Sequence, residues 1–295
     1  MSKFTPDELW KGIIEVYFEP FMHFFFGKNC KEIDFTKGCE FLDNELQKIY
    51  PASQTKNRRA DKLLKFWKKS GEEDFILVHV EVQGYEDKAM AERVFNTYYR
   101  IYDRYQKPPA VLIIYTNNNP NYHPKTFHLN TLGTKMNFDF KTFKLSEHPP
   151  HTYPKGNLFS YVMETAWYDL RKNKLSDPEL LKYKTGIVHK MKADGYKAKT
   201  IYNLLRFIVH HTRFETSIFS VKLEYKIQEI LKHDKHMSIL EMEKIKIKEE
   251  GKAEGLELSL KVIALLKKGK SIEDISKDLE IPQQKIEAIR KQIEL

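Results

Sequence analysis

The chain has little cysteine and no long hydrophobic run. Its two cysteines, Cys30 and Cys39, lack the CxxC spacing of zinc and redox motifs, and a single pair cannot build a disulfide framework. The most apolar segment, residues 16–26, contains Glu19 and is far shorter than the roughly 20 residues that a membrane-spanning helix needs. The Pro-Asp-Glu sequence at 6–8 interrupts any apolar segment of the kind found in signal peptides. We therefore expect a cytoplasmic protein without a membrane partner.

Basic residues outnumber acidic ones. The sequence has 50 lysines and arginines against 41 aspartates and glutamates, which gives a net charge of +9. Such an excess favours a polyanionic partner such as DNA, because binding releases the counterions of the phosphates. A lysine-rich surface that only keeps the protein in solution would give the same balance. The length of 295 residues allows one large domain or two.

Two strand-like runs, residues 61–67 and 75–83, flank a turn-rich patch around Gly71. This arrangement predicts a β-hairpin. A turn centred near Gly71 places Asp61, ten residues before it, opposite Glu81, ten residues after it. Directly opposed residues of antiparallel strands have Cβ atoms about 4.5–5.5 Å apart on one face of the sheet. We therefore expect the two carboxylates to converge.

The same face of the hairpin carries an amide. Gln83 lies two residues after Glu81, so strand alternation directs both side chains to one side. Two carboxylates that lie this close repel each other unless a cation sits between them, which points to a divalent metal. Asp61 also fits the description of a solvated hairpin charge. Glu81 is harder to explain in that way, because it ends a mostly apolar run of a predicted central strand, where an unpaired carboxylate is costly.

An aspartate followed by Glu-x-Lys or Glu-x-Gln on a hairpin resembles the pattern of the PD-(D/E)XK nucleases. Longer stretches closely resemble the Rpn family, described as recombination-promoting nucleases or putative transposases, in which Gln is usual at the third position. The similar stretches are DELWK (7–11), ADKLLK (60–65), VEVQ (80–83), MAERVFNTY (90–98), EGKAEG (250–255) and KGKSIEDI (268–275). Residues 120–240 match loosely, and Gly84 replaces a serine that is common in the family.

The resemblance implies a fold and a function. The fold is α/β, a restriction-endonuclease-like core with a mixed central sheet flanked by helices, followed by a helical C-terminal region. The function is metal-dependent DNA endonuclease activity of the recombination or transposase type. A different class stays open, namely a catalytically inactive DNA-binding or partner-binding protein that retains the nuclease fold.

The expected metal site combines three kinds of ligand. Asp61 and Glu81 bind Mg²⁺, with Mn²⁺ or Ca²⁺ as substitutes, because hard oxygen ligands suit these ions. The backbone carbonyl of Val82 can add a ligand. Glu15 on the first helix is the candidate for completing the shell, although a surface salt bridge explains it equally well. Gln83 would orient the attacking water by hydrogen bonds.

Two residues of the helix after the hairpin, Arg93 and Tyr98, match the family pattern and are expected to contact DNA. Lysine-rich helices of the second half would add phosphate contacts that do not depend on sequence.

The chain is expected to divide into a nuclease-like domain (1–150), a helical extension (151–240) and a tail (241–295). Thr5 and Glu8 form a predicted capping box for a helix that runs to about residue 26. The remaining predicted elements are helices over 39–50, 87–106, 161–170, 179–193, 198–211 and 221–232 and strands over 110–115 and 138–143, the last at the edge of the sheet.

The tail begins with a Lys/Glu-rich segment, 237–268, and ends in two short helices. Ser271 is expected to cap the first, 272–279, and the second covers 282–293. This pair resembles a helix-turn-helix, and its spacing fits DNA contact, a small packing unit or a homodimer contact equally well.

Overall fold

The computed structural model describes residues 4–48, 61–171, 175–231, 262, 265–266, 269–279 and 281–293. The chain divides into two compact units, Met1–Asp234 and Lys235–Leu295. The first unit contains both the expected core and the expected helical extension. Most of the predicted Lys/Glu-rich segment 237–268 lies outside the described residues.

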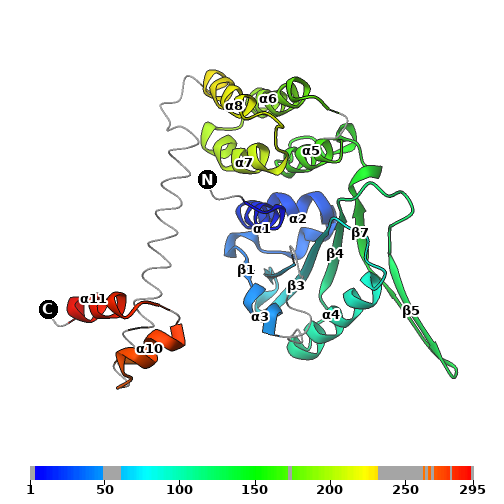
Figure 1. Ribbon diagram of the computed structural model, residues 1–295. Helices are drawn as coiled ribbons and strands as arrows, with labels where there is room; N and C mark the ends of the chain where they lie inside the picture. Colours follow the sequence, from blue (N-terminus) through cyan, green and yellow to red (C-terminus); the bar gives the residue numbers. More distant parts are fainter. Residues whose placement is uncertain are drawn as a thin grey trace. The chain divides into compact units, whose positions relative to one another are not determined.

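The core of the first unit is a mixed five-stranded sheet (Figure 1). Its strands are β1 (Glu40–Phe41), β2 (Lys62–Lys68), β3 (Gly71–Gln83), β4 (Ala110–Tyr115) and β7 (Lys141–Lys144), in the order β1-β2-β3-β4-β7. The first three strands pair antiparallel, whereas β3, β4 and β7 run parallel. The expectation of an α/β fold with a mixed sheet is thus confirmed.

The register of the β2–β3 hairpin is the one expected. Lys62 pairs with Val80 and Leu63 with His79, so continuing the ladder by one residue places Asp61 opposite Glu81. The second strand was expected to begin at residue 75, after a turn-rich patch around Gly71, but β3 already begins at Gly71. A register shift after Trp67 accommodates the shorter turn.

Two helices cover one face of the sheet, α1 (Pro6–Val16) and α2 (Phe18–Phe26) (Figure 1). The predicted capping box is present, with Thr5 and Glu8 bonded reciprocally. One continuous helix was expected, but the chain breaks at Tyr17. The cause is Pro20, which has no N–H to bond the carbonyl of Val16 and whose ring would clash with it.

The opposite face is covered by α3 (Asp43–Lys48) and α4 (Met90–Tyr105) (Figure 1). The predicted helix 39–50 was partly wrong, since its first residues form β1 and pair with β2. On α4, Met90, Val94 and Ile101 are buried, whereas Tyr102 is exposed. Strand β4 is almost fully buried because the parallel part of the sheet is covered on both faces.

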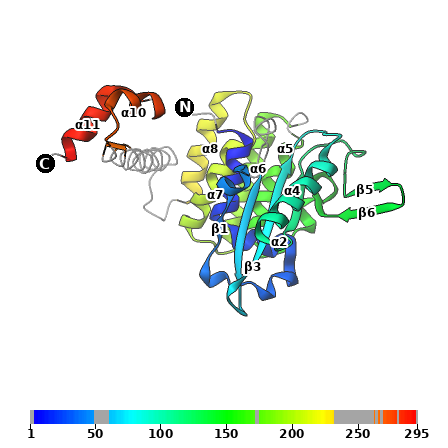
Figure 2. The ribbon, with the colours of Figure 1, turned by 90° about the horizontal axis from the view of Figure 1, so that it is seen from below.

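A separate two-stranded hairpin, β5 (Thr126–Thr131) and β6 (Thr134–Asp139), projects from the core (Figure 2). The predicted strand 138–143 was wrong as one element. It divides at Phe140 between β6 and the edge strand β7. The hairpin turn consists of Leu132 and Gly133, both with positive φ.

Four helices follow, close to their predicted ranges, and complete the first unit: α5 (Phe159–Asp169), α6 (Asp177–Ala193), α7 (Ala198–His211) and α8 (Ser217–Ile230). Short 3₁₀ helices occupy Gly27–Glu32, Phe35–Lys37, Leu145–Glu147 and Pro150–Thr152. In the second unit, α10 (Ile272–Leu279) and α11 (Gln283–Ile293) share an apolar core that includes Ile275 and Ile286. Ser271 caps α10 as expected. No helix in the described part of the chain has the length and apolar character to cross a bilayer.

Candidate metal centre

Three side chains that can bind a metal converge at the end of the β2–β3 hairpin. One ligand atom from each of Asp61, His79 and Glu81 lies within 4.8 Å of the other two. All three residues are buried, with exposed fractions of 8%, 0% and 3%. The expected meeting of Asp61 and Glu81 is therefore confirmed, and an imidazole joins them.

Local strand geometry explains this convergence. His79 and Glu81 are two residues apart on β3, so alternation directs both side chains to the face covered by α4. Asp61 reaches the same face because it lies across from Glu81 in the hairpin ladder. The buried residue His79 was not among the predicted ligands. The sequence signal for it was the same alternation that placed Gln83 with Glu81.

Arg93 on α4 reaches into this cluster. Its Nη1 donates to Glu81 Oε1 at 2.5 Å, its Nε donates to Asp87 Oδ2 at 3.2 Å, and its Nη2 lies 3.4 Å from Gln83 Oε1. Burial disfavours the charged guanidinium, but the surrounding carboxylates outweigh this effect, Glu81 foremost, and raise the pKa of Arg93 above its usual value. The guanidinium thus supplies positive charge beside the two carboxylates.

Gln83 is buried at the end of β3 and is held on both sides. Its Nε2 donates to the carbonyl of Tyr85 at 2.7 Å, and its Oε1 faces Arg93. This arrangement fixes which end of the amide faces the cluster, since the nitrogen is turned to Tyr85. One lone pair of Oε1 is left for another donor.

Glu15 is not part of this group of ligands. Its Oε1 accepts a hydrogen bond from Lys62 Nζ at 2.5 Å, and the same ammonium donates to Asp43 Oδ2 at 2.6 Å. Lys62 and Asp61 are consecutive, so their side chains leave opposite faces of the strand. Glu15 therefore forms a salt bridge, which was the alternative explanation for it, although its partner Lys62 is fully buried.

The side chain of Val82 points to the face opposite Glu81 and Gln83, as alternation requires. Gly84 follows the strand, and a Cβ built there would lie 3.4 Å from the hydroxyl oxygen of Thr116. The hydroxyl of Thr116, the residue after β4, therefore lies beside Gly84.

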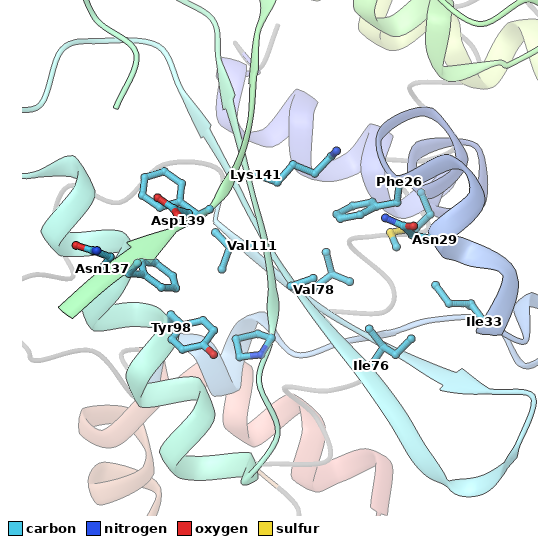
Figure 3. A pocket seen from close by; sticks show the side chains of 15 residues that line it. Phe26, Asn29, Ile33, Ile76, Val78, Tyr98, Val111, Asn137, Asp139 and Lys141 are labelled. Atoms are coloured by element: carbon cyan, nitrogen blue, oxygen red, sulfur yellow. The ribbon is translucent and has the colours of Figure 1, made fainter. Parts of the chain in front are cut away.

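Tyr98 lies at a different pocket, of about 600 Å³ (Figure 3). The labelled side chains in Figure 3 show Tyr98 facing it from α4, with Val111 from β4, Val78 from β3 and Phe26 from the end of α2. Its ring packs on Phe138 of the projecting hairpin at a centroid distance of 4.7 Å. Arg93 therefore lies at the carboxylate cluster, whereas Tyr98 contributes to the junction of α4 with β6.

Comparison with known proteins identifies no relative. No protein-family profile, no curated protein and no solved structure matches the chain. The residues and their geometry therefore carry the functional argument.

Proposed function

We propose that this protein is a metal-dependent DNA endonuclease with a PD-(D/E)XK core of the Rpn type. The observation that carries the proposal is the buried cluster of Asp61, His79 and Glu81, with ligand atoms within 4.8 Å of one another. The cluster lies toward the carboxyl end of β3, next to the parallel strand β4. In open α/β sheets, ligands bind at such strand ends.

The three side chains fit a divalent ion. Ligand atoms around an ion with bonds of about 2.1 Å are separated by roughly 3–4 Å, so a small movement of the side chains would complete the shell. Two carboxylates with an imidazole form a mixed oxygen and nitrogen donor set. Because imidazole suits transition metals better than Mg²⁺, we expect this site to prefer Mn²⁺ over Mg²⁺ and Ca²⁺.

Each residue of the site has a defined task in this proposal. Asp61, His79 and Glu81 hold the ion, which when bound lowers the pKa of a water molecule and stabilises charge on the phosphate. Gln83 accepts a hydrogen bond from the attacking water through Oε1 and so orients it. Arg93 can contact a phosphate oxygen, because a guanidinium pairs well with this group.

Nicking of a supercoiled plasmid in Mn²⁺ or Mg²⁺ tests the proposal. We expect cleavage by the unmodified protein and its loss, by at least about a hundredfold, in Asp61→Ala and Glu81→Gln, the scale of removing one charge-stabilising group. Glu92→Gln is the matched control, since it makes the same chemical change at an exposed position of α4. Equal cleavage by Glu81→Gln and Glu92→Gln would refute the assigned role of Glu81.

A second candidate function is DNA binding without turnover. The contact between Arg93 and Glu81 favours it, because a protein cation already balances one of the two carboxylates. This candidate predicts DNA binding with no cleavage in Mg²⁺ or Mn²⁺, and no gain in affinity when either metal is added. The endonuclease proposal predicts cleavage under the same conditions.

A further inference from the structure

A second pocket, of about 470 Å³, reaches the C-terminal end of β3, the strand that carries Glu81. Its walls come from the first turns of α1, the residues that follow β3 and β4, and the C-terminal ends of α5 and α7. Trp10 and Tyr85 supply aromatic surface, and Asp7, Asn117, Asp169 and His211 supply polar groups. The proposed function does not use this pocket.

The pocket and the cluster share the end of one strand. Val82 and Gly84 line the pocket, and the residue between them is Gln83, whose amide is held by the backbone of Tyr85. Strand alternation directs Gln83 to the face of the cluster and Val82 to the opposite face, so the two sites lie on opposite faces of β3 and adjoin only at its C-terminal end. A nucleotide that crosses the C-terminal end of β3, with its phosphate at the cluster, would place its base on the side of the pocket.

Asn117 presents a buried donor in this pocket. Its side chain is nine-tenths buried, and its Oδ1 accepts hydrogen bonds from Lys144 Nζ at 2.9 Å and from the backbone N–H of Asn119 at 3.1 Å. These two donors fix the orientation of the amide, with Nδ2 as the end that they do not contact. Nδ2 has no hydrogen-bond partner among the described residues, an unusual state for a buried amide.

Asp7 presents an acceptor to the same pocket. Its Oδ2 lies 3.3 Å from Lys11 Nζ, while its buried Oδ1 has no hydrogen-bond partner in the described part of the chain. A ligand that completes both groups must therefore accept a hydrogen bond from Asn117 and donate one to Asp7.

The charges of the pocket exclude a phosphate from it. Asp7 and Asp169 would repel an anion, and the nearby Lys11 already pairs with Asp7. The arginine suited to phosphate lies at the cluster instead. A nucleobase is uncharged, planar and carries donors and acceptors on one edge, and its face can stack on an aromatic ring. The phosphate of a nucleotide would thus bind at the cluster and its base in the pocket.

We propose that this pocket receives one unstacked nucleobase of the DNA strand whose phosphodiester lies at the Asp61–Glu81 cluster. The inference rests on the proposed function, and it adds a binding element that selects DNA whose bases can leave the stack. Mismatched or single-stranded DNA meets this condition at the lowest energetic cost.

The test measures binding of a short single-stranded oligonucleotide by fluorescence anisotropy, with Ca²⁺ present. Each nucleotide in turn is replaced by an abasic one, which keeps the phosphate and removes the base. We expect the full-length protein to lose about tenfold in affinity at one position of the oligonucleotide, the amount that one stacked and hydrogen-bonded base contributes. Abasic substitution at the other positions should change the affinity little.

Two variants assign the effect to the pocket. Tyr85→Ala removes an exposed ring without touching the backbone carbonyl that holds Gln83, and Asn117→Asp keeps the acceptor for Lys144 while removing the unpartnered donor. Both should bind the intact and abasic oligonucleotides equally. Tyr99→Ala, which removes another exposed tyrosine ring, on α4, is the matched control and should keep the preference.

The outcomes separate the inference from the proposed function. Metal-dependent nicking without any abasic effect would overturn the base pocket and leave the endonuclease standing. An abasic effect that Tyr85→Ala abolishes, without nicking, would support the pocket and refute turnover. Equal abasic effects in Tyr85→Ala and Tyr99→Ala would overturn the inference. It would also be overturned if free deoxynucleosides displaced the oligonucleotide while abasic substitution at every position left the affinity unchanged.

Discussion

The two faces of the β2–β3 hairpin each bury a charged cluster, and the clusters are built in opposite ways. On one face, the ammonium of Lys62 lies between the carboxylates of Glu15 and Asp43, at 2.5 and 2.6 Å. On the other, Asp61 and Glu81 lie with His79, and the positive charge comes from one side, through Arg93.

The comparison separates a structural cluster from a candidate functional one. The Lys62 cluster has its cation at the centre and its carboxylates around it, so it is complete without any ligand. The Asp61 cluster has its acceptors turned toward one another, an arrangement that a central cation would stabilise. Removal of a charge should therefore unfold the protein in the first cluster and alter metal binding in the second.

The largest effect is expected for Lys62→Met. This change leaves Asp43 partly buried without its ammonium, and breaking a buried pair costs about 3–5 kcal/mol. Glu15 loses less, because it is about half exposed. Urea unfolding followed by circular dichroism measures the loss. A stability within 1 kcal/mol of the unmodified protein, by the scale of ordinary surface substitutions, would remove the structural side of the comparison.

For His79→Ala we expect weaker binding of Mn²⁺ by at least about tenfold, with a smaller change for Mg²⁺, because imidazole is the ligand that favours the transition metal. Calorimetric titration of each ion gives the two affinities. His128→Ala, at an exposed position of β5, is the control. An equal loss for both ions would show that His79 supports the site without binding the ion.

A third buried charge, Lys184, extends the comparison to a cation whose Nζ is held by backbone carbonyls. This group donates to the carbonyls of Ile208, Val209 and Thr212 at the end of α7. Burial lowers the pKa of Lys184 to about 7, whereas the unfolded chain has the ordinary value of 10.5. Between these values the unfolded state binds more protons than the folded state, so stability rises with pH.

The contribution of Lys184 is at most about 1.4 kcal/mol per pH unit between pH 7 and 10. Denaturant unfolding at several pH values measures the slope, and Lys184→Met should lose this contribution to it. An identical slope in the variant would mean that the ammonium keeps an ordinary pKa among the carbonyl groups.

The smallest effect is expected for Asp61→Asn. It removes one of two neighbouring negative charges while Arg93 keeps its bonds to Glu81 and Asp87. The free energy of unfolding without metal should change by no more than about 1 kcal/mol, or rise, in contrast to Lys62→Met. If Asp61→Asn lowered the free energy of unfolding as much as Lys62→Met does, both clusters would be needed for folding.

Local sequence patterns predicted much of the carboxylate cluster. The turn near Gly71 and the alternation of β3 were sufficient to bring Asp61 and Glu81 together. The contact of Arg93 with Glu81 depends on how α4 packs against the sheet, which no local pattern encodes. His79 was not predicted as a ligand, although alternation places it on the same face as Glu81.

Other differences have equally local causes. The β5–β6 hairpin lacks the Asn-Gly or Asp-Gly turn that signals such structures, since Leu132 takes the position with positive φ. The break between α1 and α2 was readable from Pro20. Lys62 gave no signal, because a lysine in a strand is ordinarily expected to be exposed rather than fully buried.

Diffraction from crystals soaked in Mn²⁺, recorded with anomalous scattering from the manganese, tests the central claim most directly. We expect one strong peak among the carboxylate oxygens of Asp61 and Glu81 and a nitrogen of His79, with Arg93 withdrawn from the bound oxygen of Glu81. No peak there at saturating Mn²⁺, with Arg93 still bonded to Glu81, would contradict the metal site and the endonuclease function that depends on it.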